Sequence, residues 1–198
     1  MPKLLTVLLA VSALALTPAV AAASDGHDPD VARFAGQVRV IDDPISAQTY
    51  LVRAAASNQF EIVTGQLAQQ KAQSPDVKAL GALFVAHHTM LQEQGAAVAA
   101  ELGLTIPVAL TPRQQAIVAK LQRLEGEQFD RYWVTAQIRA HLKALALNLR
   151  TAERGRAPQV RALAQGALPV VAHHLAALVD LGEDHQEGWD DDHDEDDD

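Results

Sequence analysis

The 198-residue sequence predicts an all-α protein, an antiparallel four-helix bundle built from a duplicated helical hairpin. Four long segments carry apolar residues at helical spacing, and each begins at or beside a proline. The alternation of β-branched and aromatic residues that marks strands never persists. The tetrapeptide Val-Ala-His-His occurs twice, at residues 85–88 and 171–174. These observations favour one helical unit used twice.

The first two helices should form a hairpin. Asp43-Pro44 supplies an N-cap and a first-turn proline for a helix that runs to about Lys71. Ser74-Pro75 repeats this signal and begins a second helix that ends near Leu102-Gly103. Because only a few residues separate the two helices, they are expected to pack antiparallel.

The second half of the domain repeats this plan. A third helical region is expected from Thr111 to about Arg154, because Thr111 is followed by Pro and then by Gln at the capping-box position. Gly126 should bend it. A fourth helix is expected from Pro158 to Leu181, which bounds the four-helix bundle domain at residues 44–182.

An internal repeat relates the second and fourth helices. The second His of the repeated tetrapeptide lies 13 residues after Pro75 in one copy and 16 after Pro158 in the other. This difference is close to one helical turn. Carrying the alignment back across the two hairpins places Glu61 opposite His141. The repeat therefore predicts two equivalent hairpins.

The N-terminal segment has the layout of a cleaved signal peptide over residues 1–23. Lys3 precedes an apolar run, and small residues offer a cleavage site. The alternative is an uncleaved membrane anchor. Residues 24–43 are polar and contain turn signals, so they are expected to be a flexible leader. If the signal peptide is cleaved, we expect a periplasmic or secreted protein without a stable membrane span.

Charge is concentrated at the other end. Residues 183–198 hold 11 of the 25 acidic residues and no Lys or Arg, which leaves 14 acidic residues against 15 Lys and Arg in residues 24–182. We expect an acidic disordered tail, or alternatively a weak site for divalent cations. The body has neither the charge nor the aromatic content of a nucleic-acid-binding protein. The absence of cysteine excludes disulfides and thiolate sites.

Four polar residues, one from each predicted helix, should meet in one layer. Helical geometry points His88 and His174 toward the core, together with His141 and Glu61. The residues that share the face of Glu61 are small, so another helix or a bound ion should approach it closely. Three imidazoles and a carboxylate form a ligand set for zinc or copper, provided that the three imidazoles lie within about 6 Å of one another. The alternative is a His/Glu hydrogen-bond layer that fixes packing without metal.

Two further histidines, His87 and His173, lie at the edge of the apolar stripe and are peripheral candidates. No Glu-x-x-His motif precedes the inner histidines, so a ferritin-type di-iron centre is not expected. No constellation for a catalytic nucleophile is visible either. The sequence therefore favours a binding or structural protein over an enzyme.

Four stretches resemble the bacterial family called domain of unknown function 4142 (DUF4142), at residues 54–72, 77–90, 129–142 and 168–178. The resemblance implies an exported, ferritin-like helical bundle. It also implies that Glu61, His88, His141 and His174 are the positions usual in the family. The sequence departs from the family where an acidic residue commonly precedes a histidine, because His87 and Ala140 stand there. The family has no established activity.

Two hypotheses about function follow. The first is an exported bundle that binds a divalent metal ion through the His/Glu layer without catalysis. The second is a structural or protein-interaction module of the bacterial envelope in which this layer only fixes packing.

Overall fold

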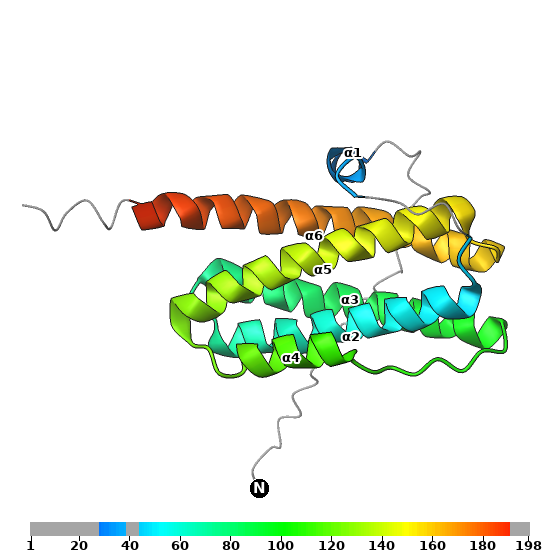
Figure 1. Cartoon of the computed structure of the whole chain (residues 1–198), viewed down its shortest axis with the longest axis horizontal. Coiled ribbons are helices and arrows are strands. Elements are labelled where there is room, and N and C mark those ends of the chain that lie inside the picture. The colour runs from blue at the N-terminus through cyan, green and yellow to red at the C-terminus, as the bar shows by residue number, and fades with distance from the viewer. Residues whose placement is uncertain (1–27, 39–43, 191–198) are drawn as a thin grey trace, which may run out of the picture.

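The computed structural model describes residues 28–38 and 44–190, and within these it contains six helices and no strand (Figure 1). The described part is thus all-α, as predicted. The expected signal peptide lies outside it, as do residues 24–27, 39–43 and 191–198. The helices are α1 (Pro29–Ala35), α2 (Ala47–Lys71), α3 (Pro75–Glu101), α4 (Pro112–Leu121), α5 (Gly126–Arg154) and α6 (Pro158–Asp190).

Two packed helix pairs form the body of the molecule, α2 with α3 and α5 with α6 (Figure 1). Three residues link α2 to α3, and Ser74 caps α3 by accepting hydrogen bonds from the backbone N–H groups of Asp76 and Val77. Three residues also link α5 to α6. The carboxylate of Asp130 on α5 accepts hydrogen bonds from the backbone N–H groups of Gln73 and Ser74, which ties the two pairs together.

Two predicted helix boundaries were wrong. Helix α2 begins at Ala47 rather than at Pro44, because Ser46 is the N-cap and its Oγ accepts a hydrogen bond from the Thr49 N–H at 3.1 Å. The predicted bent third helix is two helices, α4 and α5. Helix α4 starts with the expected capping box, but α5 starts anew at Gly126, whose φ of 56° requires glycine.

The predicted leader and tail are both partly helical. Asp28 caps α1 by accepting hydrogen bonds from two backbone N–H groups, and Phe34 of α1 is buried against α5 and α6. At the other end α6 continues eight residues past Gly182. A single glycine within a helix costs only about 1 kcal/mol, so it does not end the helix by itself. The described parts of both segments thus correct the expectation of a flexible leader and a disordered tail.

One described segment, Pro158–Glu183 of α6, is long and apolar enough to cross a membrane by length and composition. Its residues Val171, Leu175 and Leu178 are buried in the core of the bundle. Packing between helices therefore accounts for part of the apolar character of α6.

The small residues near Glu61 let another helix approach, which is one of the two alternatives that the sequence left open. A Cβ placed on Gly81 of α3 would lie 2.7 Å from the Cβ of Ala68 and 2.9 Å from the carbonyl oxygen of Gly65, both on α2. A Cβ on Gly65 would lie 2.6 Å from the carbonyl oxygen of Gly81. The two helix backbones are in contact here, so both positions require glycine.

Replacing Gly81 with alanine is expected to lower the free energy of unfolding by about 1–3 kcal/mol, because the backbones must separate to admit a methyl group. Urea denaturation measures this change. Gly95→Ala on the same helix is the matched control, since nothing lies within 4 Å of its Cβ position, and it should stabilise the chain by up to about 1 kcal/mol. Equal effects of the two substitutions would contradict the close contact.

Candidate metal centre

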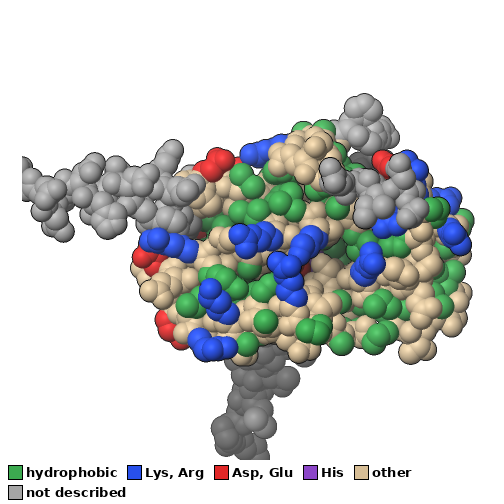
Figure 2. All heavy atoms as spheres, viewed as in Figure 1, with side chains coloured by type: hydrophobic (Ala, Val, Ile, Leu, Met, Phe, Trp, Pro, Cys, Tyr) green, Lys and Arg blue, Asp and Glu red, His purple; other side chains and the backbone are tan. Residues whose placement is uncertain are grey.

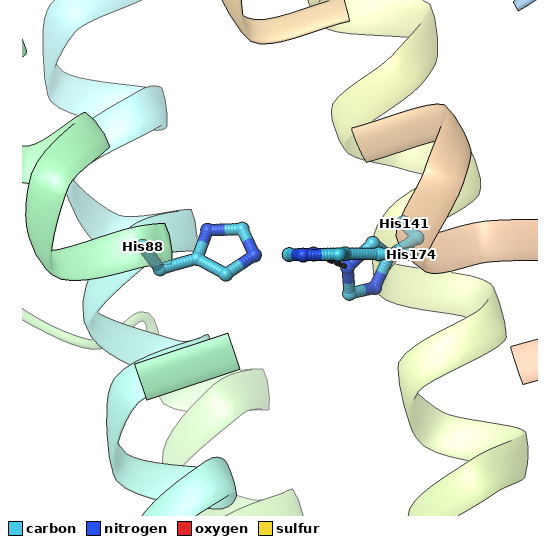
Figure 3. A group of neighbouring side chains, drawn as sticks. All are labelled: His88, His141 and His174. Atoms are coloured by element: carbon cyan, nitrogen blue, oxygen red, sulfur yellow. Dashed lines mark hydrogen bonds between the residues drawn. The ribbon is translucent and has the colours of Figure 1, made fainter. Parts of the chain in front are cut away.

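Three histidines from three helices meet in the core. His88 lies on α3, His141 on α5 and His174 on α6, and all three are at most 2% exposed (Figure 3). Each offers a ring nitrogen, and these nitrogens all lie within 4.8 Å of one another. The separation is below the limit of about 6 Å for a common site. The helices thus bring together three of the four predicted inner residues.

His88 is oriented by Asn58, which lies on the neighbouring helix α2. The Nδ1 of His88 is 3.0 Å from the Oδ1 of Asn58, so Nδ1 carries the proton and donates it to the amide oxygen. The Nε2 of His88 is buried and has no hydrogen-bond partner within the described chain. An unpaired imidazole nitrogen in a dry core is costly unless it has a ligand. Its lone pair is available to a metal ion.

His141 is oriented by its own helix. Its Nδ1 is 3.0 Å from the carbonyl oxygen of Gln137, an atom that can only accept a hydrogen bond. The proton therefore resides on Nδ1, and Nε2 presents a lone pair. This Nε2 lies 3.4 Å from the Nδ1 of His174. Hydrogen bonds that fix the tautomer of a metal-binding histidine are a regular feature of metal sites.

The two peripheral candidates have different surroundings. The Nδ1 of His87 is 2.9 Å from the Nε2 of His174, and the two rings are nearly parallel at 4°. His87 therefore contacts the centre directly, and its Nδ1 can accept a hydrogen bond from the Nε2–H of His174 when Nδ1 of His174 binds a metal. The exposed ring of His173 lies 3.6 Å from Asp30, which links α6 to α1. His173 thus lies apart from the group of three.

Glu61 does not join the group, although the sequence placed it in the same layer. Its side chain is buried, but the group within 4.8 Å contains only the three histidines. Glu61 lies one helical turn along α2 from Asn58, and its carboxyl group lies near Gln137, one turn before His141 on α5. Burial raises the pKa of Glu61 well above its ordinary value, and the hydrogen bond from Gln137 opposes this rise.

A second polar network surrounds Glu61. The amide nitrogen of Gln137 donates to Thr64 Oγ1, and the indole N–H of Trp133 donates to the Thr64 carbonyl oxygen. Two oxygens in this network, Glu61 Oε2 and Gln137 Oε1, are buried without a partner among the described atoms. A proton on Glu61 supplies a donor where both oxygens otherwise only accept. This agrees with the raised pKa of Glu61.

The core keeps the histidines neutral. Burial lowers the pKa of His141 to about 4, although its hydrogen bond to Gln137 opposes the shift. Burial and then the neighbouring imidazoles lower the pKa values of His88 and His174 well below the ordinary value. Burial also lowers the pKa of His87, with His173 as a smaller cause. Neutral imidazole is the form that binds metals.

The spacing of the ring nitrogens suits a metal ion after a small contraction. A tetrahedral ion with bonds of about 2.0–2.1 Å holds its ligand nitrogens about 3.3 Å apart. The His141–His174 pair is already at 3.4 Å, and the remaining nitrogens lie within 4.8 Å. Three histidines leave a fourth position of the tetrahedron for water or another ligand. The donor set therefore fits zinc or copper.

A cavity of about 320 Å³ reaches the centre from one side. It is lined by Asn58 and His88 at its inner end and by Ile106 and Val108 of the segment between α3 and α4, where Val108 is 53% exposed. On another side the ring of Phe84 covers the histidines, with its centroid 4.5 Å from that of His174 and 4.8 Å from that of His141. The cavity is thus an approach to the centre from the side of His88.

Sequence reasoning missed Asn58, Gln137 and the contact made by His87. Asn58 shares a helical face with Glu61, three residues away, and this was the available signal for it. Gln137 likewise precedes His141 by four residues. The close contact between His87 and His174 depends on how α3 and α6 lie against each other, and no local pattern encodes it.

These features define a class of protein, an all-α helical domain with a buried group of three histidines able to hold a metal ion. The sequence matches the family described as Domain of unknown function (DUF4142) over residues 41–181. The chain therefore belongs to the DUF4142 family.

Two solved structures of another family share the helical fold. A DUF305 fragment from Deinococcus radiodurans is 17% identical with a TM-score of 0.63, and the alignment covers 69% of this chain and 95% of that one. A putative secreted DUF305 protein from Streptomyces coelicolor is 15% identical with a TM-score of 0.58, covering 69% and 91%. At such low identity the likeness concerns the fold alone. A search of curated proteins finds no match.

Proposed function

We propose that this protein is an exported, ferritin-like helical bundle that binds one divalent metal ion, zinc or copper, without catalysing a reaction. His88, His141 and His174 are the ligands in this proposal. The observation that carries it is the convergence of three buried ring nitrogens within 4.8 Å, two of them held as lone pairs by hydrogen bonds at the other ring nitrogen. His87 supports His174 from outside the ligand group.

The duplicated-hairpin architecture belongs to the same proposal. It is supported by the two antiparallel pairs, α2 with α3 and α5 with α6, and by the repeated Val-Ala-His-His in the second helix of each pair. Its inner histidines, His88 and His174, face one another. Export is supported by the apolar start of the sequence and by the description of the Streptomyces coelicolor protein as secreted.

A binding role without redox catalysis is supported by the scarcity of carboxyl groups at the centre. Among the described residues the buried carboxyl groups are Glu61 and Asp130, and Asp130 is engaged with the α2–α3 link. Glu61 pairs with Gln137 instead of reaching the ligand group. A di-iron centre needs several carboxylates around the metals. The proposal therefore does not include redox catalysis.

Metal analysis of the purified chain tests the proposal. After incubation with zinc or copper and gel filtration, we expect about one ion per chain in the wild type and almost none in His141→Ala, because two nitrogens remain of the three. A chain without residues 191–198 reports any ion held by that acidic segment and should keep the stoichiometry. A wild-type chain that retains no ion at equimolar metal would refute the proposal.

The structural alternative is favoured by the hydrogen bonds that already connect His87, His174 and His141. In that case the layer fixes the packing of the bundle and the protein is an interaction module of the envelope. His141→Ala would then lower the free energy of unfolding in a chain that binds no metal. The two functions therefore differ in the metal content of the wild type.

A further inference from the structure

A basic groove of about 810 Å³ lies on the face formed by α2, α4 and α5, away from the histidines. Figure 2 shows Lys and Arg side chains gathered across this face. No Asp or Glu is among the described residues that line the groove. Its six basic residues are Arg53, Arg113, Lys120, Arg139, Lys143 and Arg150.

Most of these cations have no counter-ion among the described residues. Within the described chain Arg53, Arg113, Arg139 and Lys143 form neither an ion pair nor a hydrogen bond, and all four are exposed. Lys120 lies over the ring of Tyr132 at 4.1 Å, a contact that leaves its charge unneutralised. Like charges lining one concave surface repel one another and raise the local concentration of anions. The charge of the groove is thus complementary to that of a polyanion.

The same chain carries a segment of the opposite charge. Residues 191–198 read DDHDEDDD, with seven acidic residues and no basic one. The body without residues 183–198 is close to neutral. Positive charge is therefore concentrated in the groove, and negative charge in residues 191–198. An extended acidic peptide complements an elongated basic groove better than a single small anion does, because it meets several cations at once.

The point where α6 ends makes the contact geometrically feasible. Gly182 of α6 lies beside Val134 of the antiparallel α5, since its Cβ position is 3.7 Å from a methyl carbon of that valine. Eight residues later, Asp190 is level with the start of α5 at Gly126. Arg139 lies about 20 Å further along α5 at 1.5 Å per residue. Eight extended residues span up to about 27 Å, which reaches the nearer half of the groove.

We propose that residues 191–198 bind in the basic groove of their own chain and neutralise Lys120, Arg113 and Arg139. This surface and its occupant are independent of the metal centre. The contact is electrostatic, and salt weakens it.

Carbodiimide cross-linking of the full chain tests the proposal directly, because it joins a lysine Nζ to a carboxylate in contact with it. At low salt and low protein concentration we expect monomeric products in which Lys120 or Lys143 is joined to residues 191–198. These products should disappear in 0.5 M NaCl. Lys78, an exposed lysine of α3 without a partner in the described chain, is the matched control and should not be joined. Products confined to dimers, or none at the groove lysines, would overturn the proposal.

A second measurement uses a chain whose acidic residues in 191–198 are changed to Asn and Gln. Acetylation of Lys120 should be about fivefold slower in the native chain than in this variant, the factor that one well-formed surface ion pair supplies. Acetylation of Lys78 should be equal in both chains. Equal rates at Lys120 would overturn the proposal even if cross-links form.

Discussion

Zinc at a free concentration a thousand times its Kd is expected to raise the free energy of unfolding of the wild-type chain by about 4 kcal/mol. The same zinc should leave His174→Asn unchanged. The reason is linkage: an ion that binds the folded centre and not the unfolded chain stabilises the fold by mass action. His174 is the critical position because its ring contacts His141 on one side and His87 on the other. Urea denaturation with and without zinc measures both values.

The neighbouring residue supplies the control. His173→Asn changes an imidazole on the same helix that lies against Asp30, so the effect of zinc should remain that of the wild type. His87→Ala should fall between the two, with the affinity for zinc reduced about 10- to 100-fold, as for other residues that orient metal ligands. Equal stabilisation of His174→Asn and the wild type would exclude His174 as a ligand.

Acid is expected to unfold the metal-free chain at a pH where most bundles are stable. Unfolded histidines titrate near pH 6.5, whereas burial lowers the pKa of His141 to about 4. The unfolded chain therefore binds more protons between these pH values, and stability falls as the pH falls from 6.5 toward 4. His141 alone accounts for a loss of about 3 kcal/mol over this range, at about 1.4 kcal/mol per pKa unit.

Other buried groups modify this loss. His88 and His174 also have lowered pKa values, so the full fall should be steeper than for one histidine. Glu61 acts in the opposite sense, because its pKa is raised and its contribution to stability is present below its unfolded value and lost as the pH rises. Glu61 therefore reduces the dependence of stability on pH that the histidines set. The free energy of unfolding of small domains is about 5–15 kcal/mol, so the expected loss is a large fraction of the total.

Urea denaturation in a chelator at several pH values between 7.5 and 4.5 measures this slope. His141→Asn keeps a donor near the Gln137 carbonyl oxygen but cannot titrate, so its slope should be smaller by about one proton. A free energy of unfolding that stays constant between pH 7 and 5 would show that the three inner histidines are not held neutral by the core.

The helices were predictable because local sequence determines where each of them starts. The start of α3 is indicated by Ser74 and Pro75, and the start of α4 by Thr111 and Gln114. These caps involve only residues that are neighbours in the sequence. The inward direction of His88, His141 and His174 was predictable for the same reason, since helical spacing fixes which residues share a face. These inferences need no knowledge of how one helix lies against another.

The depth of each residue along the bundle was not predictable. A shift of one turn between two helices moves a side chain by 5.4 Å. This distance decides whether the side chain can reach a metal ion or not. Glu61 was misplaced in this way, because its carboxyl group meets Gln137 and not the histidines. His87 and His173 occupy equivalent places in the repeat, yet α1 covers the region of only one of them. Such differences arise from tertiary packing.

The Phe84 ring that covers the histidines has a consequence for rates. The centroid of its ring lies 5.4 Å from that of Trp133, which is fully buried. Phe84 is therefore part of the core, and it should move away from the histidines only when the core itself unfolds. The cavity lined by Ile106 and Val108 lies against His88, and the segment that closes it is neither helix nor strand. This cavity is a route by which an ion would enter and leave the centre. A chelator should therefore remove it at a speed set by the motion of this segment, and shortening the apolar side chains there should speed release without weakening the equilibrium affinity.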